Sequence, residues 1–136
     1  GTPHILSLAA LSGALMPYEA VGISAVEAAS AVVTAELCEC LVDVASTGGW
    51  TVITPQDPKQ RGGHIALAHR DAGRIAKALR GYGVIPDHRP PDILRLAPPP
   101  WSTDKSAVDE VVARILLATR DVEDGLGDPE DRELVP

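Results

Sequence analysis

Arg95 is the residue of this sequence whose type and surroundings best suit the binding of an organic anion. It lies in a short apolar segment that alternates as a β-strand does, with Leu94 and Leu96 on one face and Arg95 on the other. A strand fixes the direction of the side chain, and a planar guanidinium can donate two parallel hydrogen bonds to a carboxylate. The sequence therefore predicts a carboxylate-binding arginine. A plain ion pair with Asp87 or Asp92 is the alternative.

Prolines stiffen the chain on both sides of this segment. Six of the twelve prolines lie between residues 86 and 100. Each proline fixes φ and removes a backbone donor, so the segment has little conformational entropy to lose when it becomes ordered. We expect a short strand at residues 84–85, a stiff turn over residues 87–92 and a second strand over residues 93–97.

Two helices are predicted ahead of these strands. Thr2 is suited to be an N-cap and is followed by a proline, so the first helix should start there and end near Pro17. It is apolar over much of its circumference, which predicts burial on more than one side. The second helix should begin with a capping box formed by Ser24 and Glu27, and it should end at residues 47–49.

The remaining elements complete an α+β pattern. Residues 50–54 and 64–69 read as strands, Asp71 should cap a third helix, and one of residues 102–104 should cap a fourth. The order α-α-β-β-α-β-β-α predicts a small, mostly antiparallel sheet of three to four strands with helices packed on one face. Arg95 would then project from the open face.

Composition predicts one globular domain with an acidic tail. Of 136 residues 45% are hydrophobic, but only 3% are aromatic and Phe is absent, so the core must be built from Ala, Val, Leu and Ile. Residues 121–136 hold seven acidic residues and one basic residue, so we expect a domain over 1–120 and a disordered tail over 121–136. The net charge of −7, without a basic face, is unsuited to binding nucleic acid.

Cellular location and further ligand residues follow from a few side chains. No apolar run approaches the roughly 20 residues that cross a bilayer, and Cys38 and Cys40 fit a reducing, cytoplasmic compartment. Positions two apart in a helix do not face each other, so no metal site is expected. His88, beside Arg89 in the stiff turn, is the histidine suited to contact a ligand or to donate a proton, and Trp101 follows Arg95 closely enough to line a pocket for an aromatic ligand. Ordinary surface or core positions are the alternative for both.

Four motifs in colinear order resemble a known family: GTPHILSLAAL, GISAVEAAS, TPQDPKQRGGHIAL and GVIPDHRPPDILRLAPPP. They are similar to the C-terminal small domain of bacterial kynureninases, and the resemblance covers about residues 1–118. Kynureninases are pyridoxal-phosphate (PLP) enzymes of the aspartate-aminotransferase fold type. They hydrolyse the side-chain carbon–carbon bond of kynurenine or 3-hydroxykynurenine, which gives anthranilate, or its hydroxy form, and alanine.

The resemblance implies roles for two residues. Arg95 matches the arginine that pairs with the α-carboxylate of the PLP-bound substrate. Thr2 matches a threonine or asparagine at the dimer interface that reaches the PLP phosphate of the neighbouring subunit. The sequence departs from the family where Arg-x-Lys-Ser becomes Glu27-Ala28-Ala29-Ser30, where the aromatic of Asp-Phe-Arg becomes His88, and where Leu-Tyr becomes Trp101-Ser102.

Two functions from different classes remain open. The cofactor-binding large domain, with its Schiff-base lysine, has no counterpart in this sequence, so PLP is expected only through a separate large domain and not in this chain alone. The first hypothesis is that the chain, which begins at Gly1 rather than Met, is one part of a kynureninase-like hydrolase, with the large domain or a second copy of itself as partner. The second is a stand-alone domain without PLP chemistry that binds or transforms a small aromatic carboxylic acid.

Overall fold

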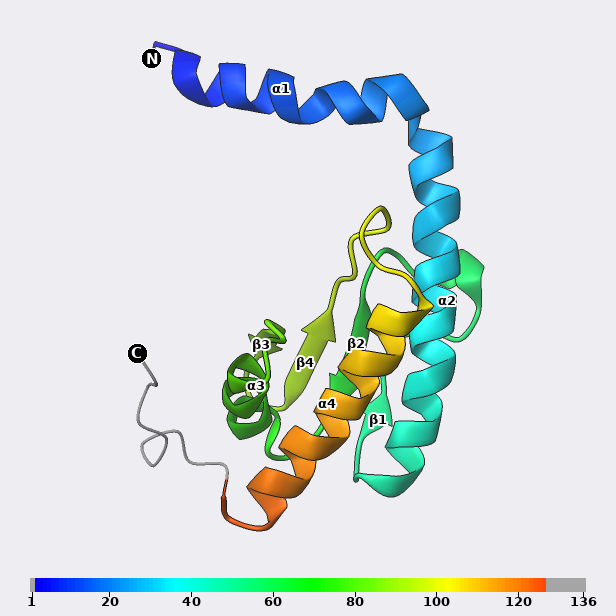
Figure 1. Cartoon of the computed structure of the whole chain (residues 1–136), viewed down its shortest axis with the longest axis vertical. Coiled ribbons are helices and arrows are strands. Elements are labelled where there is room, and N and C mark those ends of the chain that lie inside the picture. The colour runs from blue at the N-terminus through cyan, green and yellow to red at the C-terminus, as the bar shows by residue number, and fades with distance from the viewer. Residues whose placement is uncertain (1, 127–136) are drawn as a thin grey trace.

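Four α-helices and four β-strands follow one another in the expected order. The computed structural model describes residues 2–126 of the chain, and Figure 1 shows its elements. They are α1 (Ile5–Val21), α2 (Ile23–Thr47), β1 (Thr51–Val52), the short 3-10 helix η1 (Pro58–Gln60), β2 (Ile65–Ala68), α3 (Ala72–Gly81), β3 (Asp87–Arg89), β4 (Ile93–Leu96) and α4 (Lys105–Glu123).

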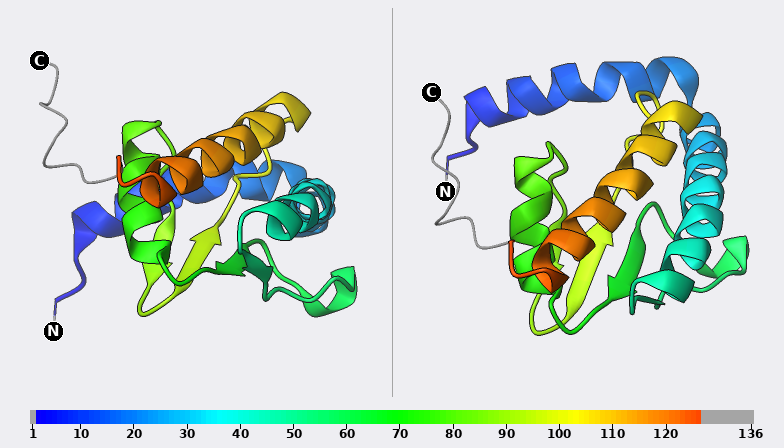
Figure 2. Two further views of the ribbon diagram at one scale, coloured as in Figure 1. Left: turned by 90° about the horizontal axis from the view of Figure 1, so that it is seen from below. Right: turned by 60° about the horizontal axis from the view of Figure 1, so that its bottom comes forward.

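The four strands form one antiparallel sheet in the order β1-β2-β4-β3. Helices α2, α3 and α4 cover one face of this sheet, and no described element covers the other face (Figure 2). The α+β architecture with helices on a single face is therefore confirmed.

The core lies between the sheet and the three helices, and strand alternation decides which side chains enter it. Leu94 of β4 and Ile65 and Leu67 of β2 are fully buried, and Leu96 is nearly so. The residues between them, Arg95 among them, point to the uncovered face. The helices contribute aliphatic residues to the same core, which are Val33, Leu37, Leu41, Val44, Ile75, Leu79, Val108, Ile115 and Val122.

Trp50 joins the start of the sheet to the last helix. Its side chain is 4% exposed, and its indole Nε1 donates a hydrogen bond of 3.0 Å to the buried Oγ1 of Thr119 in α4. The ring also lies against His69, with a centroid separation of 4.7 Å. In a chain without Phe, this indole is the large aromatic group of the core.

The ends of the first two helices differ from the prediction. His4, not Thr2, caps α1: its side chain accepts a hydrogen bond from the backbone N–H of Ser7. The helix continues through Pro17, at the cost of one backbone hydrogen bond. It ends at Gly22, whose φ of 79° suits glycine, and α2 starts directly after that residue without a side-chain cap. The predicted capping box is therefore wrong.

The first strand of the proline-rich segment also differs from the prediction. Residues 84–85 form no strand, and Ile85 is 85% exposed. Strand β3 is instead formed by Asp87–Arg89, which the sequence suggested to be part of the turn, and the turn itself is confined to residues 90–92. The pairing partner explains the difference: β4 offers its free edge to β3, and Asp87 lies opposite Arg95. The strand over residues 93–97 is confirmed as β4.

Helix α4 leads to the end of the described chain. Helix α4 extends to Glu123, and the Tyr82 hydroxyl donates a 2.6 Å hydrogen bond to Asp121, so the folded part continues beyond residue 120. Residues 127–136, most of the predicted disordered tail, lie outside the described residues.

Within residues 2–126, no single helix is both long and apolar enough to span a membrane. Helices α1 and α2 pass this test only as a pair, which is bent by 85°.

Candidate carboxylate-binding site

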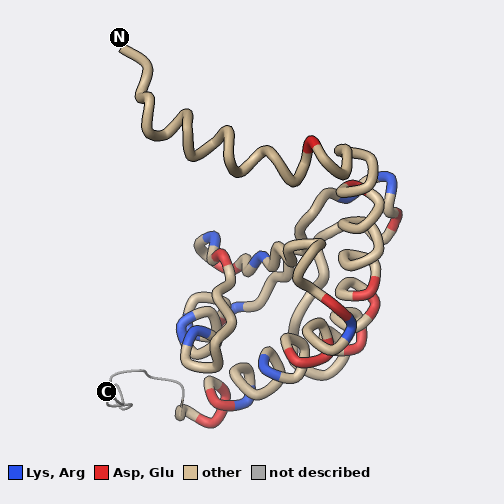
Figure 3. The backbone as a smooth tube through the Cα atoms, turned by 45° about the horizontal axis from the view of Figure 1, so that its top comes forward, with Lys and Arg blue, Asp and Glu red and all other residues tan. Residues whose placement is uncertain are grey.

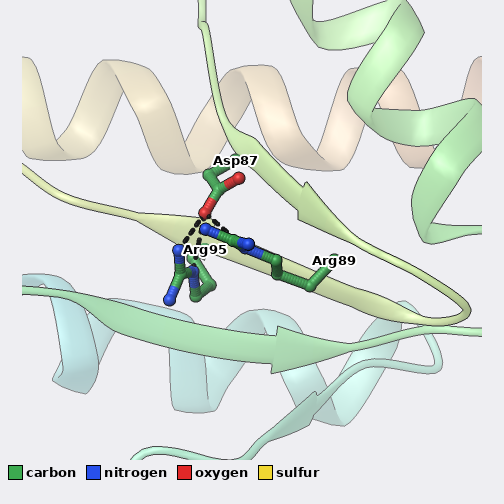
Figure 4. A network of polar contacts seen from close by, with 3 residues as sticks. All are labelled: Asp87, Arg89 and Arg95. Carbon is green, nitrogen blue, oxygen red and sulfur yellow. Dashed lines mark hydrogen bonds and ion pairs between the residues drawn. The ribbon is translucent and has the colours of Figure 1, made fainter.

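Three charged side chains meet on the uncovered face of the sheet (Figure 4). Asp87 and Arg89 belong to β3, and Arg95 belongs to the adjacent strand β4. The Oδ2 atom of Asp87 accepts hydrogen bonds from Nε of Arg95 at 2.8 Å and from Nε of Arg89 at 3.0 Å. It also accepts one from Nη2 of Arg95. Of the two ion pairs that the sequence left open for Arg95, the structure forms the one with Asp87.

Arg95 is held firmly but stays accessible. Its side chain is 33% exposed, and its partner in the register of β2 is Ala66, a residue too small to cover it. Arg95 lines neither the apolar pocket beside Val84 and Leu96, nor the polar pocket beside Glu27, nor the apolar trough beside Trp101. The guanidinium therefore lies on an open sheet face, where a carboxylate could approach it from the Ala66 side.

The pairing with arginine changes the acidity of Asp87. The hydrogen bond from Arg95 is the main cause that lowers the pKa of Asp87 below its ordinary value of 3.8, and Arg89 adds to it. Asp87 is consequently ionised whenever the protein is near neutral pH. A carboxyl group with a lowered pKa stabilises the folded state above its unfolded pKa and loses this contribution as the pH falls through the folded pKa.

We expect the Asp87→Asn variant to be slightly less stable than the parent at pH 7 and equally stable in acid. The difference should be small because exposed ion pairs contribute little, and it should vanish as the pH falls below 3.8 through the lowered pKa of Asp87. Urea unfolding of both proteins across this range, followed by circular dichroism, measures it. A difference that persists unchanged in acid would contradict the ion pair as its cause.

The structure places His88 away from Arg95. His88 is opposite the buried Leu94 in the register, so it points to the helix-covered side of the sheet. Its ring lies against α3 at Gly73, where an added Cβ would be 3.0 Å from Cε1 of His88. The ring atom Nε2 is buried, and no described residue forms a hydrogen bond with it. The predicted contact between His88 and a ligand bound at Arg95 is therefore not supported by this placement.

Trp101 and Thr2 also lie apart from Arg95. Trp101 is 55% exposed and makes an edge-to-face contact with Tyr18 of α1, with ring centroids 4.7 Å apart. It lines an apolar trough of about 200 Å³ at the bend between the first two helices, together with Val21 and Val26. Thr2 is exposed just ahead of α1. Their ligand roles stay predictions.

Helix α1 is an apolar arm that the rest of the described chain leaves uncovered. None of its residues is buried, and its large apolar side chains Ile5, Leu6 and Met16 are 74%, 79% and 65% exposed. Glu19 is its single charged residue (Figure 3). The arm leaves the body at Gly22, and it stands clear of the sheet in Figure 1 and in the right view of Figure 2. Residues 2–126 thus do not provide the burial on several sides that was expected, and an exposed apolar surface of this kind is typical of an interface.

Comparison with known proteins decides the family. The profile of the family described as "Kynureninase C-terminal domain" matches residues 26–115. The chain belongs to the kynureninase C-terminal domain family. Proteins named kynureninase are 42% identical over 82% of this chain in Geobacillus thermodenitrificans, 43% over 72% in Bacillus anthracis and 39% over 72% in Shouchella clausii.

This kynureninase C-terminal domain spans about a quarter of the length of those relatives, 26%, 23% and 23% respectively. The family is PLP-dependent, and this chain covers only its C-terminal domain. The described residues do not form a PLP site around Arg95. Lys59 is on η1, Lys77 is on α3, and the Nζ of Lys105 on α4 is bound to Asp109 at 2.8 Å. Helices α3 and α4 cover the face of the sheet opposite to Arg95.

The sequence did not identify Arg89 as a member of the charged cluster around Asp87. Arg89 shares the carboxylate of Asp87 with Arg95, but the sequence predicts a turn at Arg89 and not a strand. The signal was the two-residue spacing of Asp87 and Arg89, which places both side chains on one face once the segment is a strand.

Among the described residues, no group of three or more His, Cys, Asp or Glu is arranged to hold a metal ion.

Proposed function

We propose that this chain is the C-terminal part of a kynureninase-like hydrolase that cleaves the side-chain carbon–carbon bond of kynurenine or 3-hydroxykynurenine. Its own task is to bind the α-carboxylate of the substrate through Arg95. The placement of Arg95 carries the proposal: it lies on a rigid strand, on the uncovered face of the sheet, beside a small alanine. A strand-borne guanidinium loses little entropy when it binds a carboxylate, because its direction is already fixed.

The remainder of the reaction requires a large domain that holds PLP. When bound, PLP supplies the electron sink that carbon–carbon cleavage requires. The residues of this chain would contribute binding and orientation, because the described lysines are on η1, α3 and α4 and not on the strands beside Arg95.

Two free thiols, Cys38 and Cys40, support a cytoplasmic location.

We infer that α1 is the surface on which a partner docks, either the large domain or a second copy of this chain. An α-helix that is apolar all round is stable in water only when several of its sides are covered. The rest of the described chain covers little of α1, and one of its contacts with the helix is that of the Trp101 ring with Tyr18. When the chain is purified alone, self-association through α1 is therefore expected.

Charges placed on α1 should dissociate such an assembly. Leu8 and Leu15 are seven residues apart, hence on one side of the helix, and are 52% and 44% exposed. We expect the Leu8→Lys, Leu15→Lys double variant to sediment as a monomer at concentrations at which the parent chain is associated, with unchanged circular dichroism. The control is Leu117→Lys on α4, whose side chain is 46% exposed. A parent chain that sediments as a monomer would refute self-association.

Purification of the native protein, followed by mass spectrometry, tests the proposed hydrolase. We expect a second polypeptide with a PLP-bearing lysine to co-purify with this chain, and we expect kynurenine cleavage in that fraction only. If the chain purifies without such a partner and does not bind carboxylates through Arg95, the proposal fails.

A stand-alone domain without PLP chemistry is the second candidate, and the residues of α2 favour it. Where the family carries a basic residue, this chain has Glu27, which lines a polar pocket of about 190 Å³ with Ser30 and Arg61. The second basic position of the motif is Ala29. Such changes indicate drift from the parental reaction. A chain that purifies alone, yet binds anthranilate in an Arg95-dependent way, would support this second function.

A further inference from the structure

The ion network at Arg95 occupies only part of its guanidinium. Asp87 takes the edge formed by Nε and Nη2, and both hydrogen bonds go to the same oxygen, Oδ2. Among the described residues, Nη1 of Arg95 makes no hydrogen bond. A guanidinium offers a second edge, formed by Nη1 and Nη2, for a bidentate carboxylate. The site can therefore hold a ligand carboxylate while Asp87 stays in place.

Arg89 changes the charge that such a ligand meets. Asp87 alone would leave the pair with Arg95 without net charge, and its repulsion would offset part of the attraction that an incoming carboxylate feels. Arg89 binds the same oxygen at 3.0 Å and adds a second positive charge. Two guanidinium groups and one carboxylate leave a net charge of +1 on this patch, which matches one carboxylate of a ligand.

The neighbouring residues of β2 supply no further charge to the patch. On the side of Arg95 away from Asp87, the neighbour in the register is Ala66, and the next residue of β2 on that face is Ala68. These small apolar residues leave space for the body of a ligand but offer nothing to a second anionic group. The three charged residues of β3 and β4 therefore govern the electrostatics of the site.

We propose that Asp87 sets the charge selectivity of the Arg95 site, so that the site accepts a ligand with one free carboxylate and discriminates against a dicarboxylate. This inference rests on the proposed carboxylate-binding role of Arg95 and adds a selectivity residue to it. Without the carboxylate of Asp87, the patch carries a charge of +2, which favours a dianion over a monoanion of the same shape.

Calorimetric titration of the whole 136-residue chain at pH 7 and low salt tests this with two matched probes. Anthranilate and phthalate are both ortho-substituted benzoates, but phthalate carries a second carboxylate. We expect the Asp87→Asn variant to shift the ratio of the two affinities toward phthalate by roughly three- to tenfold. This is about the Coulomb energy of two unit charges roughly 6 Å apart, for effective dielectric constants from that of bulk water down to about half of it.

Two variants make the outcome specific. Asp92→Asn also removes one negative charge, but Asp92 is on the exposed turn between β3 and β4 and its side chain makes no ion pair among the described residues; its affinity ratio should equal that of the parent. Asp87→Glu keeps the charge and should retain the parental ratio. The inference is overturned if Asp87→Asn leaves the ratio unchanged, or if Asp92→Asn shifts it equally. In either case, anthranilate binding that depends on Arg95 leaves the proposed function standing. Absence of such binding in every variant contradicts both.

Discussion

Replacing Trp50 with alanine is expected to lower the free energy of unfolding by about 3–5 kcal/mol, the range for removing a buried aromatic side chain. The indole is 4% exposed and fills the space between the sheet and α4. Its loss leaves a cavity, and it also leaves the buried hydroxyl of Thr119 without the 3.0 Å hydrogen bond from the indole. Both effects act in the same direction.

The second tryptophan is the matched control. Trp101 is 55% exposed and contacts Tyr18 of α1, outside the core. Trp101→Ala should therefore cost less than about 1 kcal/mol, as substitutions at exposed positions usually do. Urea unfolding followed by far-ultraviolet circular dichroism measures both variants without relying on tryptophan fluorescence. Equal losses for the two variants would show that Trp50 is not the aromatic centre of the core.

Replacing Arg95 with alanine is expected to weaken the binding of anthranilate and kynurenine by about 2 kcal/mol, or roughly thirtyfold. This is the lower end of the range for removing one partner of a charged pair, because one third of the Arg95 side chain stays exposed to water. The stability of the fold should change little, since the ion pair with Asp87 is on the surface. Calorimetric titration of parent and variant at equal salt measures the loss.

Arg114 provides a control of equal exposure. Its side chain is also 33% exposed and forms an ion pair, with Glu110 on α4, but it lies on the helix-covered side of the sheet. Arg114→Ala removes the same charge from the chain, so it reports any effect of net charge alone. If both variants bind anthranilate equally, Arg95 has no direct part in the site.

The sequence predicted the parts of the fold that depend on local periodicity. Alternation in residues 93–97 correctly assigned Leu94 and Leu96 to the core and Arg95 to the opposite face. The strand predicted over residues 64–69 is present as β2. Asp104 caps α4 by accepting a hydrogen bond from Ala107, as its type and position suggested. These features follow from side chains close together in the chain, so a single sequence contains them.

The errors occurred where a distant segment decided the outcome. Residues 87–89 have the composition of a turn, and only the free edge of β4 makes them a strand. The partner of Arg95 depended on that pairing: Asp87 and Asp92 were equally plausible until the register placed Asp87 opposite Arg95. The cap of α1 was misplaced for another reason. Several residues near the start could serve as a cap, and the helix begins after His4 rather than after Thr2.

The bend at Gly22 has a practical consequence for work on this chain. None of residues 2–21 belongs to the buried set, so the described side chains that form the core between the sheet and its helices come from residue 33 onward. A shortened polypeptide that starts at Gly22 would keep every residue of the described core and would lack the exposed apolar helix α1. It is the natural starting point for solution spectroscopy and for grafting the domain onto other proteins.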